Sequence, residues 1–258
     1  MLKRVLVFTY GVACYGVFFV TFLYAMGFVG NLVVPKSIDS PATIAFMPAL
    51  AIDILLLGIF AVQHSVMARP WFKRWWTRIV PEAAERSTYV LFASLALIAL
   101  FVYWQPLGGV VWELKHPAAV TLAYTVFGLG FGMVLAATFL INHFDLFGLR
   151  QVTLYLQGTP YTKLNFRTPF FYRYVRHPLY LGFMLGFWAT PKMTAVHLLF
   201  AVMTTVYMLI AIQFEEKDLI SELGENYVSY RRNVPMILPS VSGYRAPAAK
   251  PTTVTRIA

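Results

Sequence analysis

Arg176, His177 and Pro178 stand directly before an apolar stretch, in the sequence RHPLYLG. Proline is tolerated in the first turn of a helix because its missing N–H would have no helical partner there. The helix that follows would present free backbone N–H groups and a positive dipole end beside two cationic side chains. That end suits a carboxylate or another anionic group. The alternative is a topological role, in which basic and tyrosine residues anchor a helix at the membrane surface.

A second polar group follows the next apolar stretch, where Glu215 and Glu216 are succeeded by Tyr227 and Arg231. Acidic side chains at the C-terminal end of a membrane helix face its negative dipole end, which is unfavourable unless a cation or a donor-rich ligand compensates. If the two apolar stretches form a hairpin, residues 176–180 come close to Glu215. The resulting pocket combines an anion site, a carboxylate and aromatic rings. It suits a ligand that is zwitterionic, cationic and partly aromatic.

The elements that position these residues must lie in a membrane. The 258-residue chain is only 12% charged, against about 25% in a soluble domain, and 59% hydrophobic. Apolar stretches able to cross a bilayer are expected at 5–29, 44–67, 88–103, 118–141 and 194–214, with a shorter one at 179–189. The predicted fold class is all-α: a polytopic membrane helix bundle of five to six membrane segments, with a C-terminal helical hairpin and a cytoplasmic cofactor pocket.

The net charge of +10 reflects membrane topology and not nucleic-acid binding. With the N-terminus placed in the cytoplasm, 18 of the 21 Lys and Arg residues fall inside, and only Lys36, Lys115 and Lys192 fall outside. The positive-inside rule requires such a bias. We therefore expect a multi-pass protein of the bacterial cytoplasmic (inner) membrane, in contact with the lipid bilayer, with its active site on the cytoplasmic side.

The chain is expected to form one membrane domain over 1–240, whose cofactor-binding part is about 142–239. A disordered cytoplasmic tail is expected over 241–258. Residues 215–232 carry apolar side chains at helical spacing and predict an amphipathic helix at the membrane surface.

Two groups of glycines are assigned to helix packing. Gly182 and Gly186 form a small-residue face that lets a neighbouring helix approach closely. The segment GLGFG at 128–132 resembles a nucleotide-binding loop, but it follows no strand and lies inside an apolar stretch. Packing is therefore the favoured interpretation of both.

The motif RHPLYLG, the apolar hairpin after it, and the segment EEKDLISELGENYVSY with its following V-P resemble the isoprenylcysteine carboxyl methyltransferase family of integral membrane enzymes. This resemblance covers about 157–239 and implies S-adenosylmethionine as cofactor, bound between the hairpin and the C-terminal segment. The cofactor-contacting positions that it implies are Gln157, Tyr172, His177, Pro178, Leu179, Tyr180 and Glu215. The remaining members of the expected cofactor-binding set are Arg176, Glu216, Tyr227 and Arg231.

The chain departs from that family at one position. The arginine that binds the substrate carboxylate in the prenylcysteine enzymes is replaced by Ala211, four residues before Glu215. The departure implies an acceptor without a carboxylate.

Three motifs in the N-terminal two thirds resemble a bacterial branch, the methanethiol S-methyltransferases and their NnrU-like relatives. These motifs are QHSVMAR at 63–69, ERSTY at 85–89 and NHFDLFGLRQ at 142–151. The implied reaction is methyl transfer from S-adenosylmethionine to a small thiol, methanethiol, giving dimethyl sulfide.

Such a reaction needs a base or a positive environment, because only the thiolate of an alkyl thiol is a good nucleophile. The catalytic candidates are His64, and His143 with Asp145, because histidine titrates near neutrality and a carboxylate can orient it. Structural roles stand as alternatives: packing for His64, and helix-end capping for the other two. No metal site is predicted, since metal binding by these three residues has no motive in the sequence. Asp53, deep in a membrane segment, is expected to take a structural hydrogen bond.

Two other functions remain open on the sequence. One is carboxyl or amine methylation of a lipid-like acceptor, and the other is a non-enzymatic NnrU-like membrane factor. A transporter would need a polar path across the bundle, whereas the polar residues gather on one side. This asymmetry favours an enzyme at the cytoplasmic face.

Overall fold

The computed structural model of the protein describes residues 1–244. Within them, five helices are long and apolar enough to cross a membrane, and one further apolar helix is shorter. The long helices are α1 (Leu2–Gly30), α2 (Phe46–Ala68), α4 (Glu82–Tyr103), α5 (Pro117–Ile141) and α9 (Ala195–Leu223). The shorter one, α8 (Pro178–Trp188), has 11 residues and spans about 16 Å, roughly half of a bilayer core. The predicted all-α membrane bundle is confirmed.

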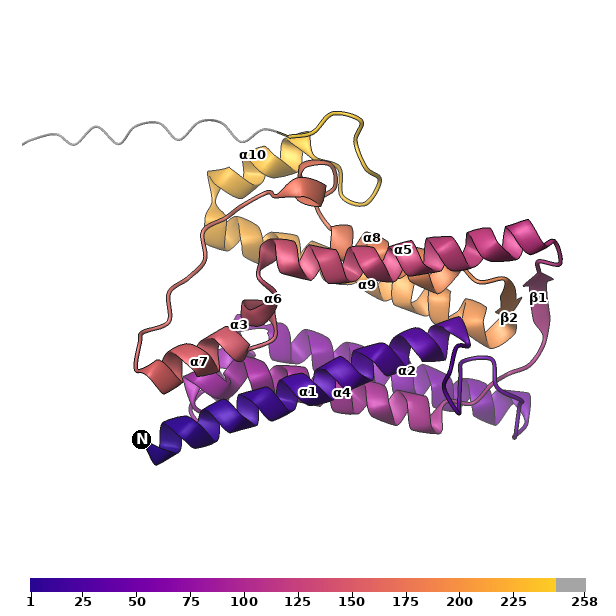
Figure 1. Cartoon of the computed structure of the whole chain (residues 1–258), viewed down its shortest axis with the longest axis horizontal. Coiled ribbons are helices and arrows are strands. Elements are labelled where there is room, and N and C mark those ends of the chain that lie inside the picture. Colours follow the sequence, from indigo (N-terminus) through magenta and orange to yellow (C-terminus); the bar gives the residue numbers. More distant parts are fainter. Residues whose placement is uncertain (245–258) are drawn as a thin grey trace, which may run out of the picture.

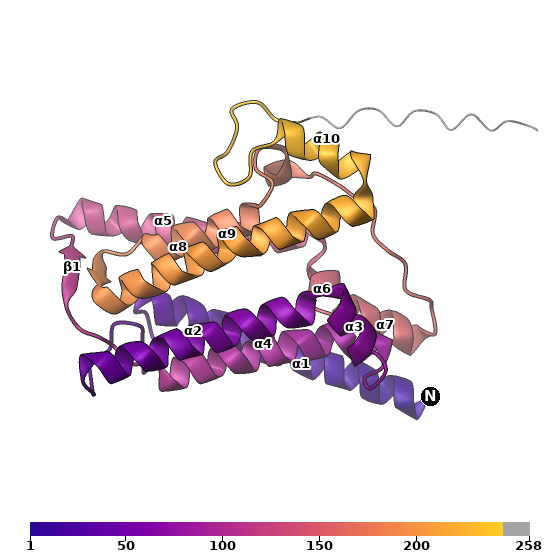
Figure 2. The same ribbon diagram turned by 180° about the vertical axis from the view of Figure 1, so that it is seen from behind.

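These apolar helices form two layers, which Figures 1 and 2 show from opposite sides. One layer contains α1, α2 and α4, and the other contains α5, α8 and α9. Short helices lie at the end of the bundle where the chain begins, here called the N-terminal end: α3 (Pro70–Trp76), α6 (His143–Leu146), α7 (Leu149–Gln157), the 3-10 helix η1 (Phe170–Arg173) and α10 (Glu225–Asn233). The opposite end, here called the β end, carries the antiparallel strands β1 (Val110–Glu113) and β2 (Lys192–Thr194).

Aromatic rings join the two layers near the β end. Trp104, just after α4, meets Phe200 of α9 in the other layer with ring centroids 5.9 Å apart, and Phe28 of α1 packs on Phe101 of α4 within its own layer at 4.9 Å. Phe28 and Trp104 are fully buried. Large buried rings supply much of the packing energy of a core. The main hydrophobic core of the bundle therefore includes this end.

A buried ion pair also ties the α1–α2 connection to α9 at the β end. Asp39 Oδ2 lies 3.2 Å from His197 Nδ1, and His197 Nε2 lies 3.0 Å from the carbonyl oxygen of Phe187. Each ring nitrogen of His197 therefore has an oxygen partner, and the ring is held between the α1–α2 connection and the end of α8. Burial alone would raise the pKa of Asp39, but hydrogen bonds from His197 and Thr194 hold it below its ordinary value.

Glycines bring α8 directly against α5. A Cβ placed on Gly130 would lie 2.7 Å from both the carbonyl oxygen of Gly182 and the backbone nitrogen of Gly186. The packing role predicted for these glycines is therefore confirmed for Gly130, Gly182 and Gly186, whereas a Cβ on Gly128 or Gly132 of the GLGFG segment would meet nothing within 4 Å.

Gly130→Val is expected to destabilise the packing of α5 against α8. The valine side chain would meet backbone atoms of α8, which cannot move aside. Overpacking of this kind costs about 1–3 kcal/mol of unfolding free energy. Gly128→Val is the matched control on the same helix, since a Cβ there meets nothing within 4 Å. Thermal unfolding in detergent should show a lower melting temperature for the first variant only. Equal melting temperatures would contradict the glycine contact.

The start of α4 differs from the sequence prediction. The helix begins at Glu82 rather than at 88, with Pro81 as its N-cap residue and Glu82 and Glu85 in its first turn. Acidic side chains there interact favourably with the positive end of the helix dipole. The helix is therefore more than one turn longer at its start than the apolar stretch alone predicts.

The end of α9 also differs. It runs to Leu223 instead of ending at 214, so residues 215–232 are not one separate amphipathic helix. Gly224 ends α9 with a φ of 57° and a ψ of −135°, a backbone conformation that glycine adopts without strain, and α10 follows. Glu215 therefore lies more than two turns before the end of its helix. The predicted conflict between the carboxylates and the helix dipole is wrong.

The last described residues fold back on the segment before α8. Ser240 N donates to Tyr174 O at 2.9 Å, and Tyr244 N donates to Arg173 O at 2.8 Å. The expected domain boundary at 240 falls inside this paired segment. The remainder of the predicted disordered tail, 245–258, lies outside the described residues.

Candidate active site

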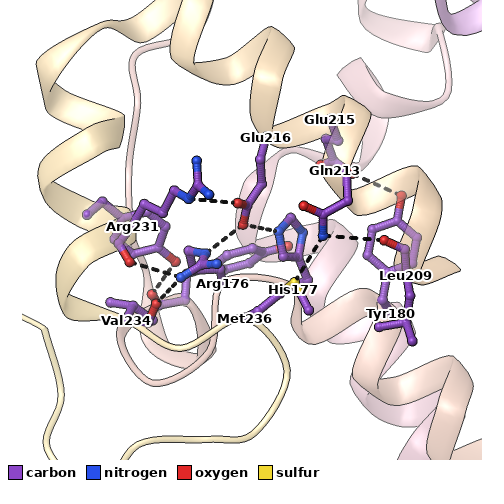
Figure 3. Close-up of polar contacts among 12 residues, drawn as sticks. Arg176, His177, Tyr180, Leu209, Gln213, Glu215, Glu216, Arg231, Val234 and Met236 are labelled. Carbon is purple, nitrogen blue, oxygen red and sulfur yellow. Dashed lines mark hydrogen bonds and ion pairs between the residues drawn. The ribbon is translucent and has the colours of Figure 1, made fainter.

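Glu216 is the centre of a buried ion network at the N-terminal end of the bundle (Figure 3). Its Oε1 accepts from Arg176 Nε at 2.7 Å and lies 3.0 Å from His177 Nε2. Its Oε2 lies 3.1 Å from Arg231 Nε. The side chains of Glu216 and Arg176 are 4% and 10% exposed, so water screens their attraction weakly. The network joins α8, α9 and α10.

Backbone hydrogen bonds hold the entry to α8 against the C-terminal segment. Arg176 N donates to Pro235 O at 2.9 Å, and His177 N donates to Met236 O at 3.2 Å. The Arg176 guanidinium also donates to the carbonyl oxygen of Val234. The V-P segment after α10 therefore fixes where α8 begins.

The N-terminus of α8 is uncapped by any side chain. His177 is its N-cap residue, Pro178 opens the first turn and Leu179 follows it. The backbone N–H groups of that turn are therefore free to bind an anionic group. The cations expected to share this task, Arg176 and His177, are instead engaged by Glu216. In the structure the chain's own Glu216 is thus the anion beside these two side chains, and an anion site at the helix end stays a prediction.

Glu215 points to a different partner from Glu216, as Figure 3 shows. Its Oε2 accepts from the Tyr180 hydroxyl at 2.9 Å, and the residue remains partly exposed. Tyr172 and Tyr227 are buried and lie within electrostatic range of Glu215. Burial raises the pKa of both phenols above its ordinary value, so they stay neutral donors.

The Tyr227 hydroxyl is buried without a hydrogen-bond partner among the described residues. Buried polar groups in folded proteins nearly always have a partner. Tyr227 is 2% exposed and also lies within electrostatic range of Glu216 and Arg176. Its unpaired hydroxyl is therefore a candidate hydrogen-bond partner for a ligand, as the sequence predicts for Tyr227.

Gln157 does not join this cluster. It is the last residue of α7, and α7 packs against α1 through the buried contact of Val152 with Val7. α1 belongs to the layer opposite α8 and α9 (Figure 1). The buried valine face of α7 thus carries Gln157 away from the other expected cofactor residues.

His143 is enclosed by α1 and α5. Its Nδ1 lies 2.8 Å from Thr138 Oγ1, its Nε2 lies 2.8 Å from the Tyr15 hydroxyl, and its ring stacks on Phe139 at 4.2 Å. The side chain is buried, and both ring nitrogens have partners. A structural role, which the sequence left open, fits this position.

Asp145 does not pair with His143 as the sequence suggested. It accepts from Arg150 Nη1 at 2.9 Å and from the Tyr161 hydroxyl at 3.2 Å. The physical reason lies in the turn: Asn142 caps α6 by accepting from Asp145 N at 3.1 Å, and the two side chains leave this short helix toward different neighbours. No histidine–carboxylate pair forms here.

His64 differs from these two because its neighbour in sequence, Ser65, contacts Tyr207 of α9 in the other layer, with 3.1 Å between the two hydroxyl oxygens. Its ring nitrogens lie 2.9 and 3.0 Å from the Tyr89 hydroxyl, and its ring stacks on Phe60 at 5.2 Å. Tyr89 lies within electrostatic range of Glu215 on α9 and of Tyr180 on α8. Of the three expected catalytic residues, His64 is the one that the fold brings toward the Tyr180–Glu215 pair.

Asp53 has the structural hydrogen bond expected of it, since its Oδ1 accepts from Gln105 N at 2.8 Å just beyond the end of α4. Within residues 1–244, no three His, Cys, Asp or Glu side chains are grouped so as to hold a metal ion.

Comparison with known proteins gives relatives over nearly the whole chain. A methanethiol S-methyltransferase of Crocosphaera subtropica is 56% identical over 240 residues, which are 93% of this chain and 94% of the relative. Another, of Mycobacterium tuberculosis, is 53% identical over 238 residues, 92% of this chain and 98% of the relative. The chain belongs to the methanethiol S-methyltransferase family. Nurim of Xenopus laevis is more distant, at 28% identity over 72% of this chain and 69% of its own. No family profile and no solved structure matches the chain.

In this member of the family, sequence reasoning missed three polar residues near His64. Tyr89 bonds to His64, and the Tyr207 hydroxyl lies 3.1 Å from Ser65 Oγ. A signal for Tyr207 exists, because it precedes Glu215 by eight residues, so the i, i+4, i+8 spacing places both on one side of α9. Tyr89 ends the ERSTY motif, but nothing in the sequence pairs it with α2.

Folding stability should depend on His143 at acidic pH. Burial lowers the pKa of His143, so below the ordinary histidine value of about 6.5 the unfolded chain binds its proton more readily than the folded protein. The free energy of unfolding should therefore fall as pH drops below that value. Melting temperatures measured from about pH 8 to pH 5.5 should decline less for His143→Gln than for wild type. Parallel curves would show that His143 carries no such linkage.

Proposed function

We propose that the protein is a membrane S-methyltransferase that transfers a methyl group from S-adenosylmethionine to methanethiol, giving dimethyl sulfide. The observation that carries this proposal is the identity of 56% and 53% with methanethiol S-methyltransferases over more than nine-tenths of the chain. The names of these relatives imply a methyl donor and a thiol acceptor. The site geometry supports a donor of the expected kind.

The residues at the N-terminal end fit S-adenosylmethionine by their chemistry. The uncapped first turn of α8 suits its carboxylate. Glu215 provides a partly exposed negative charge for its cationic groups, and the orphan Tyr227 hydroxyl offers a buried hydrogen bond. When bound, the cofactor supplies an electrophilic methyl group on a positively charged sulfur. The Glu216 network then acts as the frame that holds these groups in place.

The acceptor side of the site must handle a proton, because methylation of a thiol releases one. His64 is the proposed acceptor of that proton, because an imidazole nitrogen can take up a proton and Tyr89, which contacts its ring, lies within electrostatic range of Glu215. Ala211 lies one turn of α9 before Glu215 and offers no cation to bind a carboxylate. A small uncharged thiol fits this surface better than a carboxylated lipid.

The N-terminal end of the bundle is proposed to face the cytoplasm of a bacterial inner membrane. Lys36, Lys115 and Lys192 lie in the segments at the β end, whereas the other basic residues of the described chain lie toward the N-terminal end. The positive-inside rule then orients the active site inward.

The test is methyl transfer by the purified protein given S-adenosylmethionine and methanethiol, with dimethyl sulfide measured by headspace gas chromatography. Product is expected only with both substrates present. A farnesylcysteine-type acceptor serves as the comparison: methyl ester formed there, without dimethyl sulfide, would favour a carboxyl methyltransferase. If neither product forms, the result would favour the alternative that the protein is a non-enzymatic membrane factor.

Glu215→Ala is expected to abolish measurable cofactor binding while the protein still inserts into membranes. The carboxylate is partly exposed and bonds only to Tyr180 among the described residues, so its loss removes a ligand charge and breaks no buried ion network. Calorimetric titration with S-adenosylhomocysteine measures the effect. Glu222→Ala is the control, because its partner Lys163 is 81% exposed. Unchanged affinity in Glu215→Ala would exclude the cofactor role.

A further inference from the structure

The hydroxyl of Tyr89 lies close to both ring nitrogens of His64, at 3.0 Å from Nδ1 and 2.9 Å from Nε2. The two rings pack with centroids 5.1 Å apart. Tyr89 is 7% exposed, whereas His64 is only partly buried. The imidazole is therefore the less covered of the two side chains.

A phenol is suited to hold an imidazole that gains and loses a proton. Its hydroxyl donates to an unprotonated ring nitrogen, and its oxygen accepts from a protonated one. A carboxylate or a carbonyl oxygen can only accept, so it would favour the protonated ring. One hydroxyl can bond to only one ring nitrogen at a time, so the other nitrogen stays free to take up a proton, and the phenol keeps its contact in both protonation states.

The ring of Tyr89 also contacts Arg86, which limits its movement. The Arg86 guanidinium carbon lies 5.1 Å from the centre of this ring, and Arg86 Nε donates to the carbonyl oxygen of Leu146 at 2.7 Å. A cation over an aromatic face is attracted to it. Arg86 thus links the Tyr89 ring to α6, between α5 and α7, and the phenol has little freedom to turn.

We propose that Tyr89 is a positioning residue of the methyl transfer: it fixes the orientation of the His64 ring, next to the contact of Ser65 with Tyr207 of α9, so that the ring can take the proton released by the thiol. The proposal rests on the proposed function and on His64 as proton acceptor. It replaces the His143–Asp145 pair, which the fold does not form, by a phenol–imidazole pair. Tyr89 acts through His64 and does not touch the substrate.

The test is a double-mutant cycle on turnover. Tyr89→Phe should lower kcat by up to about 100-fold, the loss typical of a misplaced catalytic group. Its KM for S-adenosylmethionine and its affinity for S-adenosylhomocysteine should not change. Because Tyr89 acts through His64, the double variant Tyr89→Phe/His64→Gln should be no slower than His64→Gln alone.

Tyr10→Phe is the matched control. The Tyr10 hydroxyl lies 3.0 Å from Thr88 Oγ1, so this variant removes a phenol hydroxyl that contacts the residue before Tyr89 and not His64. It should keep wild-type kcat. The melting temperature of each variant shows whether it folds, and the binding of S-adenosylhomocysteine shows whether its cofactor site is intact.

Wild-type kcat in Tyr89→Phe would overturn the inference. So would a full additional loss in the double variant, because additivity would mean that the phenol acts independently of the imidazole. Absence of dimethyl sulfide with the wild-type protein would overturn the proposed function itself, and this inference with it. The two failures are therefore distinguishable.

Discussion

Glu216→Ala is expected to lower the melting temperature of the purified protein by on the order of 10 °C. Removing one partner of a buried ion network leaves uncompensated charge, which costs about 3–5 kcal/mol, and for a chain of this size each kcal/mol corresponds to roughly 2–4 °C. The stranded group is Arg176, whose side chain is 10% exposed. Thermal unfolding in detergent, followed by circular dichroism, measures the change.

Glu225→Ala is the matched control for this stability effect. Glu225 pairs with Arg232 at 3.8 Å, with side chains 79% and 73% exposed, and exposed pairs contribute about 0–1 kcal/mol. A shift in Glu216→Ala no larger than in this control would contradict a structural role for the network. The neighbouring Glu215→Ala should show the opposite profile, with cofactor affinity lost and the melting temperature nearly kept.

His64→Gln is expected to slow turnover by about 10²–10⁴-fold, the usual contribution of a general base. The deficit should shrink as pH rises, because solvent then supplies more thiolate and the base is needed less. Cofactor affinity should stay near the wild-type value. Initial rates of dimethyl sulfide formation across a pH series measure this prediction.

His143→Gln separates proton transfer from structure in the same assay. Both ring nitrogens of His143 have partners inside the α1–α5 contact, so any loss in this variant should be independent of pH and should follow its lower melting temperature. A deficit in His64→Gln that stays constant with pH would contradict its role as proton acceptor. Thiolate formation would then depend on the positive charge of the donor sulfur.

Much of the architecture could be predicted because apolar length is a strong signal. The hairpin of α8 and α9 followed from two apolar stretches with a short turn, and it correctly brought residues 176–180 close to Glu215, which accepts a hydrogen bond from Tyr180. The α8 start followed from Pro178, which fits only a first helical turn. These inferences rest on local chemistry and on the thickness of a bilayer.

The roles of adjacent carboxylates could not be predicted in the same way. Glu215 and Glu216 are about 100° apart around α9, so a small rotation of the helix decides which one meets the cations. The sequence assigned the anion site to Arg176 and His177, but the chain's own Glu216 occupies both.

Contacts between distant helices were also beyond the sequence. His143 and Asp145 are two residues apart and were paired for that reason, yet Asn142 turns the chain and the partners of His143 come from α1 and α5. Likewise the contact of His64 with Tyr89 depends on how α2 packs against α4, which no local pattern encodes.

The central claim is that the protein moves a methyl group from S-adenosylmethionine to the sulfur of methanethiol. The most direct measurement supplies S-adenosylmethionine with a trideuterated methyl group and analyses the headspace by mass spectrometry. The account predicts dimethyl sulfide carrying one deuterated and one ordinary methyl group, formed by the wild-type protein and strongly reduced in Glu215→Ala. Unlabelled dimethyl sulfide, or none while labelled ester or amine appears on another acceptor, would contradict it.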